Sequence, residues 1–223
     1  MESSKKPLSK TSVIIIYLIL FYTAWALHEF FGKPFLQSIF PTEHAANLFS
    51  SFLIKNLVWT LPALLLVKHF RSEVHIPLKE MFTNKFKVLP LILVLLGITG
   101  YFLITAYRTH GALKIKEDFG IYYVLLYILT GITEESVFRG WLLNATYKKE
   151  KEWQMLLLNG VMFLCVHFPI WIMTGKFIPM FTSLSFLFIF PLSILFSLCF
   201  LKNRNIIPAM IVHAYWDILT AVF

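Results

Sequence analysis

Charged residues are scarce in this chain of 223 residues, since Asp, Glu, Lys and Arg together make up only 14% of it. A soluble domain usually carries about a quarter charged residues and fewer than half apolar ones. Here 58% of the residues are hydrophobic and the mean hydropathy is +0.72. A single core cannot hide so much apolar surface. The composition therefore excludes an ordinary soluble domain and predicts a protein whose solvent is the lipid bilayer.

Cysteines and polar linkers are equally sparse. The two cysteines, Cys165 and Cys199, lie in apolar runs and make no disulfide framework, so we interpret them as small buried side chains. No long polar tail, repeat or low-complexity linker divides the chain, which favours a single membrane domain over residues 1–223. The net charge of +8 does not indicate a nucleic-acid partner, because the basic residues lie between apolar runs, as in membrane topogenesis.

Long apolar runs are what the sequence does contain. A membrane-spanning helix needs about 20 mostly apolar residues, and seven segments meet this requirement, at 12–31, 47–67, 88–107, 120–146, 154–173, 179–201 and 206–223. The sequence therefore predicts an all-α fold, a polytopic membrane bundle of about seven transmembrane helices. A short interfacial helix is expected in the longest polar connection, residues 68–87.

The first apolar run follows Lys5, Lys6 and Lys10 and reaches Ala24-Trp25-Ala26, so it resembles a signal peptide with a small-residue cleavage site. The apolar stretch continues beyond that point through Leu27. We therefore expect this segment to remain as the first span.

The distribution of Lys and Arg predicts the orientation. With a cytoplasmic N-terminus, the inner segments hold 13 of the 20 Lys and Arg residues and the outer segments hold 5. Cytoplasmic loops carry the excess of these residues, so we expect a multi-pass protein of the cell membrane with its N-terminus in the cytoplasm. The other two, Lys55 and Arg139, lie within spans, and Lys55 is expected to snorkel to the outer interface.

A few acidic and imidazole side chains also lie within apolar segments. A charge at the centre of a spanning helix costs about 2.5–3.5 kcal/mol on insertion scales, so such residues usually face the bundle interior and are functional candidates. They are Glu134, Glu135, His167, His213 and Asp217. Counting the helical rise from the polar ends allows Glu134, His167 and His213 to meet around one cavity inside the bilayer.

Helical spacing assigns different roles to these groups. Glu135 and Arg139 are four residues apart and can form a salt bridge, for which we expect a structural role. Glu134 is turned by about 100° from its neighbour and is left for chemistry. His213 and Asp217 are also four apart, so Asp217 can accept a hydrogen bond from His213 and fix its tautomer.

Three segments resemble the motifs of the CPBP family, also called the Abi family or type II CAAX prenyl endopeptidases. "EESVFRG" looks like its E-E-x-x-x-R motif, and "FLCVH", Phe163 to His167, is similar to F-x-x-x-H. "NIIPAMIVHAYWD", Asn205 to Asp217, resembles the third motif, in which a His is followed four residues later by Asn or Asp. The resemblance covers about residues 120–220, which would be the catalytic core.

The resemblance implies a helical intramembrane endopeptidase that hydrolyses a peptide bond of a membrane-associated, prenylated or leader-bearing peptide without a cofactor. The catalytic residues it implies are Glu134, His167, His213 and Asp217, with Glu135, Arg139 and Phe163 in support. Glu134 would remove a proton from a water held by His167, while His213 and residue 217 would stabilise the oxyanion. An asparagine at position 217 could donate a hydrogen bond to the oxyanion, whereas an ionised Asp217 only accepts hydrogen bonds. It would have to be protonated or act through His213.

Two other classes of function compete with this reading. Two His and two Glu can ligate zinc in an open site, but the sequence has no H-E-x-x-H and an arginine beside a cation site is unfavourable. A metal-free site is therefore preferred. A non-enzymatic protein, either a bacteriocin-immunity or partner-binding protein or a proton-coupled carrier, also fits intramembrane acids and histidines, although no inverted repeats support a carrier. A binding role would survive Glu134→Gln, whereas catalysis would not.

Overall fold

The computed structural model describes residues 8–223, whose regular secondary structure consists of helices without a β-strand. Lys5 and Lys6 of the predicted basic tail lie outside the described residues. Helix α1 (Lys10–Leu27) begins where the Ser9 hydroxyl accepts a hydrogen bond from the Ser12 backbone N–H, as an N-cap does. The helix continues through η1 (His28–Gly32) and α2 (Lys33–Ile39) to form a first span of 30 residues.

Within residues 8–223, six helical segments are long and apolar enough to cross a membrane, judged by length and composition. They are Lys10–Ile39, Glu43–His69, Val88–His110, Ile121–Thr146, Lys149–Met173 and Ser185–Asn203. A seventh apolar helix, α13 (Ile207–Val222), has 16 residues and is shorter. The predicted all-α polytopic bundle is thus confirmed, with the shorter helix in place of the last predicted span.

Several spans are built from more than one helical element. The second comprises α3 (Glu43–Phe49), η2 (Ser50–Ile54), η3 (Asn56–Thr60) and α4 (Leu61–His69). The fourth comprises α7 (Ile121–Glu135), η4 (Ser136–Leu143) and α8 (Asn144–Thr146). The third span is α6 (Val88–His110), and the short α5 (Leu78–Thr83) lies in the polar connection, where an interfacial helix was expected.

The fifth span begins at Lys149, earlier than the predicted 154, and the sixth covers Ser185–Asn203 rather than the predicted 179–201. The fifth runs through η5 (Lys149–Lys151), α9 (Glu152–Cys165) and α10 (Phe168–Met173), with a turn at residues 166–167. Pro169 has no N–H with which to continue the ladder, which explains the break just before it. The sixth runs through η6 (Ser185–Phe188) and α12 (Ile189–Asn203), while α11 (Phe177–Thr182) is a separate short helix.

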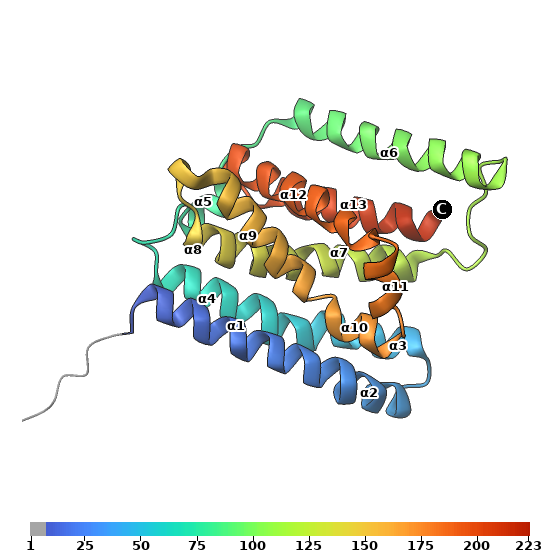
Figure 1. The fold of residues 1–223 in the computed structure, drawn as a ribbon, viewed down its shortest axis with the longest axis horizontal. Helices are drawn as coiled ribbons and strands as arrows, with labels where there is room; N and C mark the ends of the chain where they lie inside the picture. The colour runs from blue at the N-terminus through green and yellow to red at the C-terminus, as the bar shows by residue number, and fades with distance from the viewer. Residues whose placement is uncertain (1–7) are drawn as a thin grey trace, which may run out of the picture.

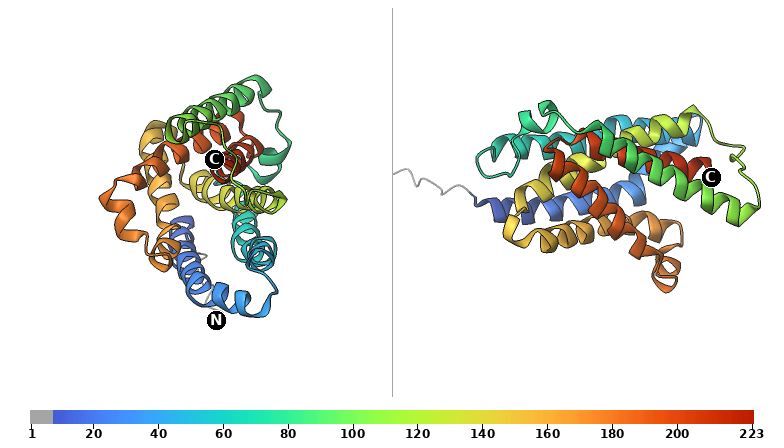
Figure 2. Two further views of the ribbon diagram at one scale, coloured as in Figure 1. Left: turned by 90° about the vertical axis from the view of Figure 1, so that its right-hand side faces the viewer. Right: turned by 90° about the horizontal axis from the view of Figure 1, so that it is seen from above.

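The long helices run side by side, with the start of α1 at one end of the bundle and the C-terminus toward the other (Figure 1). Helix α6 lies along one edge and α1 along the opposite edge, and the end-on view shows both at the periphery (Figure 2). Helix α7 lies in the interior against α13. The close approach depends on Gly131, because a Cβ there would lie 2.8 Å from the carbonyl oxygen of Met210.

Hydrogen bonds group the connections at the two ends of the bundle. At one end the Ile206 N–H donates to the Met81 carbonyl, and the Asn144 amide donates to the Ile76 carbonyl. At the other end the Lys116 N–H donates to the Val222 carbonyl. The connection at residues 68–87 therefore lies at the same end as the turns after α8 and α12, as the alternating topology requires.

Large apolar side chains remain exposed on the outer faces of the bundle. On α6, only Ile98 and Ala106 are buried, while Leu89, Leu93 and Leu96 are among its exposed side chains. Such a surface suits lipid rather than water. The observed arrangement therefore suggests a multi-pass membrane protein.

Candidate active site

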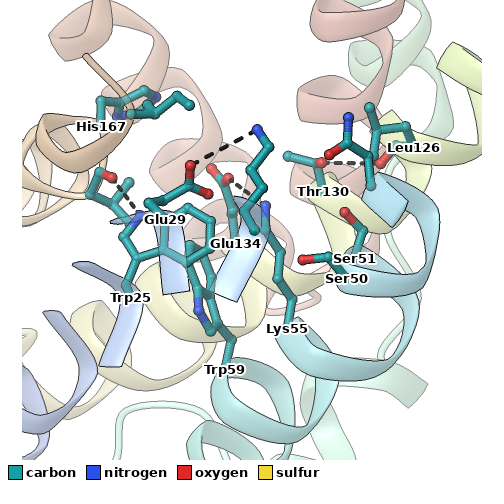
Figure 3. A pocket seen from close by; sticks show the side chains of 14 residues that line it. Trp25, Glu29, Ser50, Ser51, Lys55, Trp59, Leu126, Thr130, Glu134 and His167 are labelled. Atoms are coloured by element: carbon teal, nitrogen blue, oxygen red, sulfur yellow. Dashed lines mark hydrogen bonds and ion pairs between the residues drawn. The ribbon is translucent and has the colours of Figure 1, made fainter. Parts of the chain in front are cut away.

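A cavity of about 220 Å³ opens among α1, the second span, α7 and the α9–α10 turn, and Figure 3 shows the side chains around it. Three π-helical turns lie at or beside the cavity, η1 in the first span and η2 and η3 in the second. A fourth, η4, follows directly after the adjacent glutamates. Wide helical turns of this kind are rare in proteins overall, and those that occur are often found at functional sites.

Glu134 lies at the last turn of α7 and lines this cavity. It is only 8% exposed. Its two carboxylate oxygens face different basic side chains, since Oε1 is 4.0 Å from Nζ of Lys55 and Oε2 is 3.8 Å from Nε2 of His213. Neither separation is a hydrogen bond, so the carboxylate retains its capacity to accept a proton.

His167 lines the same cavity from the turn between α9 and α10. Its Nδ1 lies 3.0 Å from the Phe163 carbonyl oxygen, which can only accept, so Nδ1 carries the proton. In the neutral ring Nε2 then holds a lone pair that can accept a hydrogen bond from water. The two residues that the family resemblance implies in water activation thus line the same cavity.

Glu135 points away from that space and pairs with Arg139, whose Nη1 lies 2.8 Å from Oε1 of Glu135. Both side chains are fully buried. Arg139 Nη2 also donates to the carbonyl and hydroxyl oxygens of Ser193 on α12, at 2.9 and 2.8 Å. The pair predicted from spacing is therefore present, and it also ties the fourth span to the sixth.

His213 is held differently from the arrangement expected of it. Its Nδ1 lies 2.7 Å from Oε1 of Glu135, whereas its Nε2 is 3.5 Å from Oδ2 of Asp217 without a hydrogen bond. Glu135 rather than Asp217 is therefore the hydrogen-bond partner that orients the ring. The reason is tertiary: α13 packs on α7 and brings His213 next to the buried Glu135–Arg139 pair, while Phe196 stacks on the ring at 4.6 Å.

Phe163 lies among the functional side chains. Its ring meets the rings of His167 and His213 edge-on, with centroids 5.3 and 5.7 Å apart. The Arg139 guanidinium lies 4.6 Å from the Phe163 centroid, within cation–π range. Phe163 therefore separates the two histidines and packs on the arginine, which suits a supporting position.

Lys55 does not snorkel to the outer interface. Its side chain is 12% exposed and extends into the cavity toward Glu134, as Figure 3 shows. Its ammonium lies 4.9 Å from the ring of Trp25 and 5.0 Å from that of Trp59. The buried carboxylate and the two aromatic faces attract the cation inward, which the sequence position alone does not indicate.

Other cavity residues were not among the sequence candidates. Glu29 is 5% exposed and has one carboxylate oxygen without a hydrogen-bond partner, while Lys33 lies 3.9 Å from that oxygen. Glu29 and Lys33 lie near the end of the first apolar run. Charged residues at such a position are expected at the membrane surface, so the sequence did not place them in a site. Outside the cavity, the sequence did not indicate that Ser193 binds Arg139, because serines are common in apolar helices.

The acidic and imidazole side chains of the site are not arranged as a set of metal ligands. Among residues 8–223, no group of three or more His, Cys, Asp or Glu side chains is placed to hold a metal ion. The charge of Glu135 is already matched by Arg139 at 2.8 Å. The residues of this site therefore offer no ready ligand set for zinc.

The region of the chain that matches a known family contains all three motifs. A family model described as type II CAAX prenyl endopeptidase Rce1-like matches residues 117–219. No curated protein and no solved structure matched the chain.

Proposed function

From the premise that the chain belongs, over residues 117–219, to the Rce1-like family of type II CAAX prenyl endopeptidases, we propose that it is an intramembrane endopeptidase acting through a water activated by Glu134 and His167. The observation that carries this proposal is the shared cavity. It is lined by a carboxylate free to accept a proton and by an imidazole whose Nδ1 is occupied by the Phe163 carbonyl.

The proposed reaction begins with a water between these two groups. Glu134 takes a proton from the water, and His167 Nε2 accepts the hydrogen bond that orients it. The water oxygen bonds to the carbonyl carbon of the substrate, whose oxygen takes up the electron pair as an oxyanion. When the intermediate collapses, the C–N bond breaks and Glu134 returns its proton to the leaving amine. A positioned general base of this kind contributes roughly 10²–10⁴-fold to rate.

The remaining motif residues have supporting roles in this proposal. Glu135, Arg139 and Phe163 hold the end of α7 against α12 and α9. His213 presents Nε2 toward the Glu134 carboxylate at 3.8 Å. Asp217 lies beside that nitrogen and acts through His213.

The proposed substrate is a membrane-associated peptide or protein, with prenylated and leader-bearing peptides as the chemical classes to examine. The site is walled by helices whose outer faces are apolar, so a substrate with an apolar anchor would share the same bilayer. We propose further that the N-terminus is cytoplasmic, because the segments on the same side of the membrane as the N-terminus hold the excess of Lys and Arg.

The experiment compares the full chain with Glu134→Gln in lipid nanodiscs, using internally quenched peptides with and without a farnesylated CAAX end. Wild type should cleave, and Glu134→Gln should lose roughly 10²-fold or more. Glu29→Gln is the matched control, because it changes a second glutamate of the same cavity. Equal cleavage by wild type and Glu134→Gln would reject the proposal, and a non-enzymatic binding role would then be favoured.

Because these peptides are probes rather than known substrates, mass spectrometry of membrane and secreted peptides accompanies the assay. New peptide ends should appear in cells with wild type and be missing with Glu134→Gln. The zinc-dependent alternative predicts stoichiometric zinc in the purified protein, with chelator inactivation that added zinc reverses.

A further inference from the structure

The Lys55 ammonium is a cation in the catalytic cavity for which neither the family motifs nor the proposed water activation provides a role. It lies 4.0 Å from Oε1 of Glu134. This distance is too long for a hydrogen bond, so its N–H groups are not consumed by the carboxylate. A third group between them can therefore receive a hydrogen bond from Lys55.

Two tryptophans hold this ammonium at a defined position. The rings of Trp25 and Trp59 lie 4.9 and 5.0 Å from Nζ. Trp25 in turn donates from Nε1 to the Val166 carbonyl at 2.8 Å, and Val166 directly precedes His167. The cation is thus connected to the same turn that holds the proposed water-orienting histidine, which favours preorganisation over a mobile lysine.

His213 and Asp217, which the family resemblance implies as oxyanion stabilisers, are poorly placed to donate a hydrogen bond to an oxyanion in this cavity. An ionised Asp217 can only accept hydrogen bonds. His213 donates from Nδ1 to Glu135, and its Nε2 faces two carboxylates, at 3.5 Å from Asp217 and 3.8 Å from Glu134. Neither residue lines the cavity. The cavity contains one other lysine, Lys33, which lies 3.9 Å from Glu29. Lys55 is therefore the cavity cation that faces Glu134.

We propose that Lys55 is a catalytic residue that donates a hydrogen bond from Nζ to the substrate carbonyl oxygen as it becomes an oxyanion. The water activated by Glu134 forms the new C–O bond, the carbonyl electron pair moves to oxygen, and the ammonium meets that charge without transferring its proton. On collapse the C–N bond breaks and the amine leaves with the proton held by Glu134. This role rests on the proposed endopeptidase function.

The test measures kcat and KM for Lys55→Met and Lys55→Gln in nanodiscs with the peptide that wild type cleaves. Methionine keeps an apolar stem between the two tryptophans and removes the charge, while glutamine keeps an uncharged donor. Removing one oxyanion donor typically lowers kcat by about 10²–10³-fold. We expect a loss of this size in Lys55→Met with little change in KM, and a smaller loss in Lys55→Gln.

Lys33→Met is the matched control, since it removes a second positive charge from the same cavity, and it should keep its kcat. A peptide phosphonate, whose tetrahedral anion mimics the intermediate, supplies a readout without turnover. It should bind Lys55→Met more weakly by about the same factor and bind Lys33→Met as it binds wild type.

The outcomes separate this proposal from the function on which it rests. Suppose that Glu134→Gln loses cleavage while folded Lys55→Met or Lys55→Gln keeps the wild-type kcat. That result would overturn the proposed role of Lys55 and leave the endopeptidase function standing. Unchanged phosphonate binding in either Lys55 variant would do the same. Wild-type cleavage by Glu134→Gln would overturn both proposals.

Discussion

The Nδ1 atom of His213 lies 2.7 Å from Oε1 of Glu135, a residue 78 positions earlier in the chain. The same oxygen accepts the hydrogen bond from Arg139 at 2.8 Å. One carboxylate oxygen therefore joins α7, η4 and α13, while Glu134 beside it faces the cavity. The two adjacent glutamates therefore differ in environment: Glu135 is fully buried and paired, and Glu134 lines the cavity.

Arg139→Ala should lower both the abundance and the thermal stability of the protein. The change leaves Glu135 buried without its partner, and breaking a buried ion pair costs about 3–5 kcal/mol. It also removes the two hydrogen bonds to Ser193. Unfolding in detergent, followed by fluorescence, measures the effect. Arg139→Lys is the control that keeps the charge, and normal stability of Arg139→Ala would contradict a structural role for the pair.

Glu134→Ala and His167→Ala should be strongly non-additive. If both groups act on one water, removing either already abolishes its activation, so the double variant should be scarcely slower than the worse single variant. Single-turnover rates on the cleaved peptide measure this, with folding checked by size-exclusion chromatography. Two multiplicative losses would mean that the residues act independently.

Asp217→Asn should preserve or raise kcat. The amide can donate a hydrogen bond that the ionised aspartate cannot, and the substitution keeps the side-chain shape near His213 Nε2, 3.5 Å away. The measurement is kcat alongside thermal stability. Loss of cleavage in a stable Asp217→Asn protein would show that the negative charge is needed to balance His213.

Gly131→Ala should destabilise the packing of α7 on α13. The new Cβ would lie 2.8 Å from a backbone oxygen of Met210 and 3.2 Å from Cβ of Ala214, and overpacking of this kind costs about 1–3 kcal/mol. Gly97→Ala is the matched control, because nothing lies within 4 Å of its Cβ. A Gly131→Ala protein as stable as Gly97→Ala would argue against the close approach of these helices.

The cytoplasmic orientation can be checked by labelling single cysteines in a background lacking Cys165 and Cys199. Lys79 and Lys114 are exposed at opposite ends of the bundle. A membrane-impermeant maleimide should label Lys114→Cys in intact cells and should label Lys79→Cys after permeabilisation alone. The reverse pattern would overturn the orientation.

Much of the fold and part of the site could be predicted because their causes are local. The cost of placing polar groups in lipid identifies each span from its own composition, and the helical repeat pairs Glu135 with Arg139 within one turn. The same cost identified Glu134, His167 and His213 as interior residues before any contact was known. None of these inferences requires the position of another helix.

Contacts between helices far apart in sequence were decided by the tertiary structure alone. The pattern assigned His213 to Asp217 through their spacing, but the packing of α13 on α7 supplies Glu135 instead. Lys55 likewise lies within a span in the sequence, and only the approach of α7 and Trp25 shows that it faces the cavity rather than the interface. Helical periodicity determines which face a side chain occupies, whereas the partner on that face depends on how the helices pack.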